Sequence, residues 1–274
     1  MYRLFTILIF LSITAILSGQ NKPDEKGKPK DEKTVKYDRS LDFDYKVEKN
    51  LQVAINGKNV PYKVTAATMP VWDDDGKAIA GVFYTYYERT DIANKASRPL
   101  VFSFNGGPGT ASVWMMLGFT GPRLLHIDDE GYPLQPYGLK DNPNSILDVA
   151  DIVYVDPVNT GFSRPVNKDV PRDKFFGVNA DVQYLAGWIN SFVNKYQRWA
   201  SPKFLIGESY GATRVSGLAL ELQNSHWMYL NGVILVSPTD LGIKRDGPVG
   251  RALTLPYYAA TAWFHKALPP ELQK

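Results

Sequence analysis

The sequence predicts an α/β fold, in which a mostly parallel sheet is flanked by helices and preceded by an antiparallel meander of strands. One observation is a set of four short apolar runs that are nearly uniform rather than alternating, as is typical of strands buried on both faces. Another is helical periodicity after the second run and again after the third, which indicates parallel strands joined by crossover helices. The four runs cover residues 99–104, 151–155, 203–206 and 232–236.

Composition limits the possible functions. The chain has 274 residues, of which 44% are hydrophobic, enough to bury a sizeable core. The net charge of +3 excludes a function that depends on a strong electrostatic field, such as histone-like binding of nucleic acid. The absence of cysteine excludes disulfides, thiolate metal sites and cysteine nucleophiles, and 3 histidines leave little room for a histidine-rich metal site.

Residues 1–20 are predicted to be a secretory signal peptide. Arg3 gives a positive start, residues 4–17 form an apolar run broken only by threonine and serine, and Ser18 and Gly19 follow as small residues. The run is short for a membrane span, which takes about 20 residues, so an uncleaved anchor is the less favoured alternative. We expect an exported protein, periplasmic or extracellular, with no stable membrane span after cleavage. An exported chain without cysteine points to a bacterial source.

Residues 21–45 are predicted to be a charged flexible linker, because their many charges and two prolines cannot form a core. The folded core is predicted over residues 46–245, and strands are expected first. Residues 60–66 alternate in part and residues 80–87 are rich in β-formers, with a tight turn at Asp73–Gly76 between them.

The aspartates of this turn also suggest calcium. The EF-hand spacing, however, requires an aspartate at the position of Val71, and a turn is sufficient to explain the aspartates.

Two helices are predicted between the later strands. The first lies within residues 173–199, where apolar side chains recur at spacings of three and four. The second covers residues 213–222. The stripe of the first helix consists of Val182, Leu185, Ile189, Phe192, Val193 and Tyr196.

The pentamer Gly207–Gly211 matches the pattern G-x-S-x-G and follows an apolar strand at the start of a helix. A sharp strand-to-helix turn exposes the serine hydroxyl, and the helix N-terminus favours a developing oxyanion. Ser209 is therefore the predicted nucleophile of an α/β-hydrolase fold. The alternative is a plain glycine turn that caps the helix.

The glycine-rich segment Asn105–Gly109 follows the first apolar run, where α/β-hydrolases take a second oxyanion donor. A simple turn is one alternative. Phosphate binding is another, but the segment lacks the Lys-Ser/Thr ending of a phosphate loop and the spacing of a dinucleotide loop.

Four motifs in order across residues 100–240 resemble the serine carboxypeptidases of peptidase family S10. These motifs are Phe104–Ser112, Gly121–Pro122, Asp156–Ser163 and Gly207–Gly211. In addition, residues 255–263 look like the start of the helical insertion of bacterial relatives, so residues 246–274 are expected to begin a helical lid.

The resemblance implies a function for each matching position. Ser209 would attack the scissile carbonyl, and the backbone N–H groups of Gly107 and Tyr210 would form the oxyanion hole. The free C-terminal carboxylate of a peptide or protein substrate would be bound at Asn105, Gly106 and Glu208. Glu208 would share a proton with that carboxylate, since two like charges in contact raise one pKa. No metal or cofactor is implied.

The chain also departs from the family pattern. Thr110 stands where cysteine is usual, and Phe104 where tryptophan is frequent. Histidine and aspartate partners are expected after the nucleophile, in the order Ser, Asp, His. The residues of these types downstream of Ser209 are His226, Asp240, Asp246 and His265. His226 precedes the fourth apolar run and so comes too early, and His265 lies in the expected insertion without family-like surroundings. Asp240 directly follows the end of that run and is explained as a turn residue.

We therefore expect the chain to stop inside the insertion, without the triad Asp and His, with an unpaired sheet edge and weak or no peptidase activity. Two alternatives stay open. One is an esterase or acyltransferase with the same nucleophile, and the other is a non-catalytic peptide-binding relic.

Overall fold

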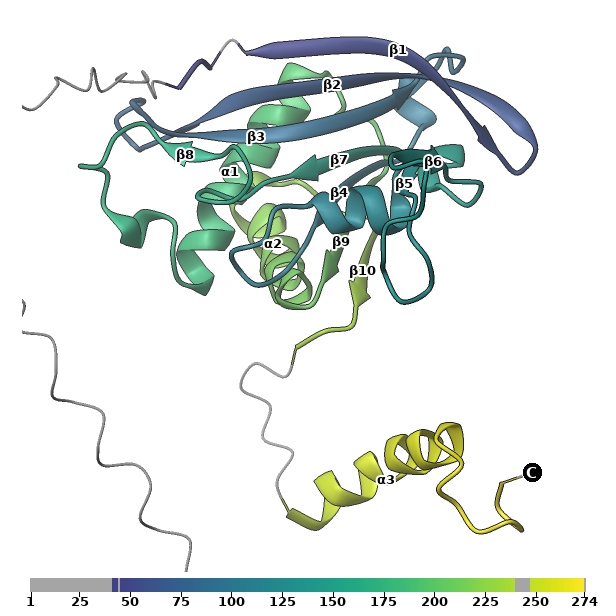
Figure 1. Cartoon of the computed structure of the whole chain (residues 1–274). Helices are drawn as coiled ribbons and strands as arrows, with labels where there is room; N and C mark the ends of the chain where they lie inside the picture. The colour runs from purple at the N-terminus through teal and green to yellow at the C-terminus, as the bar shows by residue number, and fades with distance from the viewer. Residues whose placement is uncertain (1–40, 44, 240–246, 274) are drawn as a thin grey trace, which may run out of the picture. The chain divides into compact units, whose positions relative to one another are not determined.

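The computed structural model describes residues 41–43, 45–239 and 247–273. The predicted signal peptide and most of the predicted linker lie outside the described residues. A mixed sheet with the strand order β1-β2-β3-β7-β4-β9-β10 organises the fold, and a short strand β8 (Arg164–Pro165) pairs with β3 (Figure 1). The chain therefore has the predicted fold class, a mostly parallel sheet with flanking helices after an antiparallel meander.

The antiparallel meander consists of β1 (Lys46–Ile55), β2 (Lys58–Trp72) and β3 (Ala78–Arg89). The predicted turn at Asp73–Gly76 joins β2 to β3. Asp73 stabilises it, because its Oδ1 accepts hydrogen bonds from the backbone N–H groups of Asp75 and Lys77 at 3.2 and 2.8 Å. The turn thus uses this aspartate as a backbone cap.

The parallel part of the sheet contains the four predicted strands, β4 (Leu100–Phe104), β7 (Asp151–Val155), β9 (Lys203–Glu208) and β10 (Gly232–Val236). Strand β3 pairs with β7 in the antiparallel sense and so joins the two parts. Every residue of β4 and β7 is buried. These two strands therefore confirm the prediction of strands covered on both faces.

One face of the sheet is covered by α1 (Val178–Lys195) and α2 (Tyr210–His226), which lie side by side (Figure 1). The predicted stripe of α1 packs into the larger core cluster. The helix begins later than expected because Gly177 has φ +103°, which a right-handed helix cannot continue. Helix α2 begins earlier than expected, directly after Ser209.

The opposite face carries short elements that the sequence did not predict, and their buried side chains form a second core cluster with strand residues such as Ile152 and Tyr154. These short elements lie between β4 and β7. They are a π-helix η2 (Met115–Thr120), a two-stranded hairpin of β5 (Arg123–Leu125) and β6 (Leu139–Asp141), and a 3₁₀ turn η3 (Ile146–Asp148). Two further 3₁₀ turns lie in other loops, η1 (Lys95–Ser97) and η4 (Arg172–Lys174).

Strand β10 contradicts the prediction of uniform burial. Val233, Ile234 and Leu235 are 38%, 47% and 50% exposed. Within the described residues β10 pairs only with β9, so it forms an edge of the sheet and its apolar side chains lack cover on the outer side. In the described ranges, the outer edge of β10 is therefore unpaired, as expected.

Helix α3 (Gly247–Phe264) falls in the range predicted for the start of a helical lid and contains Pro256. Within the described part of the chain, no helix has the length and apolar character needed to cross a membrane.

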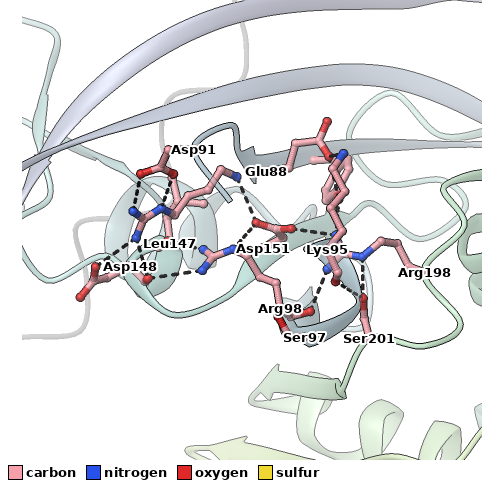
Figure 2. Close-up of polar contacts among 12 residues, drawn as sticks. Glu88, Asp91, Lys95, Ser97, Arg98, Leu147, Asp148, Asp151, Arg198 and Ser201 are labelled. Atoms are coloured by element: carbon pink, nitrogen blue, oxygen red, sulfur yellow. Dashed lines mark hydrogen bonds and ion pairs between the residues drawn. The ribbon is translucent and has the colours of Figure 1, made fainter. Parts of the chain in front are cut away.

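A buried ion cluster, here called the basal cluster, lies at the amino ends of β4 and β7 and consists of Arg98, Asp151 and Arg198 (Figure 2). Asp151 accepts hydrogen bonds from Arg98 Nε and Arg198 Nη1, both at 2.7 Å, and from the backbone N–H of Arg89 at 3.0 Å. The cluster connects β3, β4, β7 and the segment after α1 in one network.

Candidate active site

Ser209 lies between the end of β9 and the first residue of α2, in a strained turn. Its φ of +56° and ψ of −122° are unusual for a residue other than glycine. Such strain costs about 1–3 kcal/mol and persists only where the surroundings impose it. Here the backbone N–H of Ser209 donates to Val236 O at 2.9 Å, and α2 starts at the next residue. Ser209 is half-buried and is not part of a continuous helix.

The two glycines of the pentamer allow this turn. A Cβ on Gly207 would lie 2.0 Å from Gly211 O, and a Cβ on Gly211 would lie 2.9 Å from Phe104 O. Since real Cβ atoms do not approach backbone so closely, both positions require glycine. This explains in physical terms why the pattern has glycine on both sides of the serine.

The loop Asn105–Pro108, here called the glycine loop, packs directly against the turn. A Cβ on Gly106 would lie 2.7 Å from both Glu208 O and Tyr210 N, and 2.8 Å from Ser209 Cβ. Gly107 follows with φ +105° and is exposed. The structure therefore brings the predicted oxyanion loop to the predicted nucleophile, although they are about 100 residues apart in sequence.

Asn105 and Glu208, the predicted carboxylate-binding pair, contact each other. Asn105 Nδ2 donates to Glu208 Oε2 at 3.1 Å, and Asn105 Oδ1 accepts from the backbone N–H of Met115 at 2.9 Å. Asn105 is buried and held at both ends of its amide, whereas Glu208 is only half-buried. Glu208 is thus the more accessible member of the pair.

His226 does not lie near Ser209, the predicted nucleophile. It is the last residue of α2, whose first residue follows Ser209, and a helix of that length spans about 25 Å. Upstream, His126 Nδ1 lies 3.1 Å from Pro136 O in the hairpin of β5 and β6. The remaining downstream candidates are Asp240, Asp246 and His265. Both aspartates lie outside the described part of the chain.

Asp156, which sequence reasoning left without a function, connects the loops that follow β4 and β7. Its Oδ1 accepts from the backbone N–H of Ser112 at 2.9 Å, and the Oγ of Ser112 donates to Val155 O. A Cβ on Gly161 would lie 1.9 Å from Asp156 Oδ2, so the loop closes tightly over the carboxylate. The signal in the sequence was the aspartate that directly follows a buried strand at the same sheet edge as Ser209.

Asp156 is expected to make stability depend on pH. Burial raises its pKa from 3.8 to about 6, partly offset by hydrogen bonds from the backbone N–H groups of Ser112 and Phe162. Because the folded-state pKa is the higher one, the stabilising contribution is complete below pH 4 and is lost as the pH rises through 6. At about 1.4 kcal/mol per pKa unit, the loss is about 3 kcal/mol.

The measurement is urea unfolding of wild type and Asp156→Asn between pH 4 and 7. The difference in unfolding free energy between the two proteins should shift by up to about 3 kcal/mol across this range, to the disadvantage of wild type at pH 7. Other titrating groups cancel in the difference. If the unfolding free energies of the two proteins change with pH in parallel, Asp156 is not the source of the pH dependence.

Comparison with known proteins adds a family match. Residues 58–239 match the family model described as serine carboxypeptidase, Peptidase_S10. The range contains Asn105, Ser209 and all the strands of the sheet from β2 to β10.

Curated proteins similar to this chain are serine carboxypeptidases or serine carboxypeptidase-like proteins. A serine carboxypeptidase S10 family member from Dictyostelium discoideum is 26% identical over 65% of this chain and 38% of its own length. Serine carboxypeptidase-like 16 from Arabidopsis thaliana is 28% identical over 69% of this chain and 43% of its own. The chain thus spans about two fifths of the length of these relatives.

The crystal structure of a prohormone-processing carboxypeptidase from Saccharomyces cerevisiae matches with a TM-score of 0.53 and 19% identity. The match covers 76% of this chain and 49% of that one. This likeness supports the fold.

Proposed function

Since the chain belongs to the serine carboxypeptidase family, we propose that it is a serine-type peptide hydrolase that removes C-terminal residues, with Ser209 as its nucleophile. The observation that supports this most directly is the strained turn at Ser209 with Gly106 packed against it. A strained strand-to-helix turn presents a serine hydroxyl to substrate, and a glycine-lined backbone next to it leaves room for a carbonyl.

In the proposed reaction Ser209 Oγ attacks the scissile carbonyl carbon and loses its proton to a base. The carbonyl oxygen becomes an oxyanion, stabilised by the backbone N–H groups of Gly107 and Tyr210, where the α2 N-terminus adds a favourable dipole. Collapse of the tetrahedral intermediate breaks the peptide bond, releases the amine with a proton, and leaves an acyl-enzyme that water hydrolyses.

The base is not assigned to His226, which lies at the far end of α2. Without a base the Ser209 hydroxyl stays a neutral alcohol, and removal of a triad member typically leaves only the residual rate from oxyanion stabilisation and binding. Among the residues that the structure describes, no histidine forms a hydrogen bond with Ser209, and we therefore propose that this chain by itself hydrolyses peptides slowly.

Glu208 and Asn105 are proposed to bind the terminal carboxylate of the substrate. Asn105 supplies a fixed amide, and the half-buried Glu208 shares a proton with the incoming carboxylate. Such a pair favours peptides with a free C-terminus over amidated peptides. It therefore separates a carboxypeptidase from an esterase or acyltransferase with the same nucleophile.

A serine-directed fluorophosphonate probe is expected to label wild type at Ser209 and to leave Ser209→Ala unlabelled. Labelling should be slow, at the residual rate that oxyanion stabilisation supports without an assigned base. Peptide mapping of the adduct identifies the residue. A peptide with a free C-terminus should slow labelling more than its C-terminal amide does, and Glu208→Gln should reduce this difference.

The other outcomes each decide against part of the proposal. Labelling that is insensitive to the C-terminal carboxylate would favour the esterase or acyltransferase. Peptide binding without labelling of Ser209 would favour a non-catalytic peptide-binding relic. The distance of His226 from Ser209 is the observation that supports this alternative. Labelling at another residue would overturn the assignment of the nucleophile.

A further inference from the structure

Arg214, on the second turn of α2, is a fully buried arginine that connects the nucleophile helix to the glycine loop. It is 1% exposed. Its Nη1 donates to Asn105 O at 2.9 Å, and its Nη2 donates to Pro108 O at 3.4 Å. One side chain thus binds both ends of the loop that contains Gly106 and Gly107.

Asp181, in the first turn of α1, holds the Arg214 side chain in place. Arg214 Nε donates to Asp181 Oδ2 at 2.8 Å, and both side chains are buried. Burial raises the pKa of Asp181, and the guanidinium of Arg214 opposes this shift. The rigid, planar guanidinium holds its donors in fixed directions toward acceptors on two sides, whereas the ammonium of a lysine is a compact point charge with rotatable donors.

The same guanidinium also packs on the residue that follows the nucleophile. Its central carbon lies 5.2 Å from the ring centroid of Tyr210 and 5.8 Å from that of Phe104. Arg214 therefore contacts the glycine loop, whose Gly107 is one proposed oxyanion donor, and Tyr210, which is the other.

We propose that Arg214 is a positioning residue that fixes the glycine loop relative to the N-terminus of α2 and so sets the spacing of the two oxyanion donors. This inference rests on the proposed function. The role of Arg214 goes beyond stability, because its acceptors are the backbone carbonyls of Asn105 and Pro108, on either side of the donor Gly107.

Arg198 in the basal cluster provides a matched control. It is also 1% exposed and also forms an ion pair with a buried aspartate, Asp151. It lies at the amino ends of the parallel strands, whereas Ser209 follows the carboxyl end of β9. Replacement of Arg214 leaves the buried Asp181 without its cation, and replacement of Arg198 removes one of the two guanidinium partners of the buried Asp151, so both should reduce stability.

The experiment measures the kinetics of Ser209 labelling by a fluorophosphonate in Arg214→Met, Arg214→Lys, Arg198→Met and Arg198→Lys. All proteins are compared at a temperature where circular dichroism shows them folded. Arg214→Met is expected to lower the limiting rate constant of labelling about 100-fold, as for the loss or misplacement of one oxyanion donor. Arg214→Lys should lose about tenfold, since lysine keeps the charge opposite Asp181 but not the bridging geometry.

The loss should fall on the limiting rate constant and leave the probe concentration at half-saturation within about twofold, because the donors act in the transition state. The two Arg198 variants should label within about twofold of wild type despite lower melting temperatures. If the Arg214 variants label as fast as the Arg198 variants, the inference is overturned. If the methionine variant does not fold, the lysine pair decides.

A second measurement separates this inference from the proposed function. If wild type is not labelled at all, the proposed function fails, and hydrogen exchange then tests the position of the loop directly. Amides of residues 105–112 should exchange at least tenfold faster in Arg214→Met than in Arg198→Met. Equal exchange in the two variants would overturn the inference.

Discussion

Replacement of Asp151 by alanine is expected to lower the free energy of unfolding by about 3–5 kcal/mol. Asp151 is 1% exposed and is the acceptor shared by Arg98, Arg198 and the backbone N–H of Arg89. Its loss leaves two buried guanidinium groups without their carboxylate. Part of their hydrogen bonding survives, but the charges remain uncompensated. Arg198 also donates to the Tyr86 hydroxyl. Arg98 also donates to Leu147 O (Figure 2).

Urea unfolding of Asp151→Ala beside Asp91→Ala tests this expectation. Asp91 also pairs with an arginine, Arg89, but is 37% exposed, so its loss should cost less than about 1 kcal/mol. Asp151→Asn keeps the shape and removes the charge, and it should fall between the two. A loss at Asp151 no larger than that at Asp91 would show that the basal cluster does not hold the meander to the parallel strands.

Replacement of Gly106 by alanine is expected to reduce the labelling rate of Ser209 at least about 100-fold. The new Cβ would lie under 3.0 Å from Glu208 O, Tyr210 N and Ser209 Cβ, and backbone on both sides prevents a local adjustment. The glycine loop must therefore move away from the nucleophile turn. Displacement of an oxyanion donor by about 1 Å is enough for a loss of this size.

Gly109→Ala in the same segment is the matched control. A Cβ on Gly109 meets nothing within 4 Å, and its φ lies outside the left-handed range, so alanine should label within about twofold of wild type. Circular dichroism and the melting temperature identify any global unfolding of Gly106→Ala. Unchanged labelling of a folded Gly106→Ala protein would mean that the glycine loop contributes nothing to the reaction of Ser209.

The order of the elements and the place of the nucleophile turn were predictable from sequence because their signals are local. The uniform apolar runs predicted β4, β7 and β9, and the pentamer after β9 predicted the strand-to-helix turn at Ser209. The rule that parallel strands end at one edge then predicted that the loop after β4 would lie beside this turn. The contact of Gly106 with Ser209 confirms that juxtaposition.

Element boundaries and the edge of the sheet were less predictable. Helix α1 begins only after Gly177, whose left-handed conformation has no distinct signal in a stretch rich in charges. The run of β10 has the same apolar composition as the other strands, yet its side chains are exposed. The burial of a strand's side chains depends on the elements that lie beside the strand and over it, and the composition of the strand does not specify these elements.

The sequence by itself determined the fold class, the strand-to-helix turn at Ser209 and the glycine loop beside it, because each depends on residues that are neighbours in the chain or on a general rule of sheet topology. Only the tertiary structure decided the partners of the buried charges. Arg214 binds a carbonyl 109 positions away, and Arg198 binds an aspartate 47 positions away. A buried charge takes the nearest acceptor in space to offset its desolvation, and folding alone determines which acceptor that is.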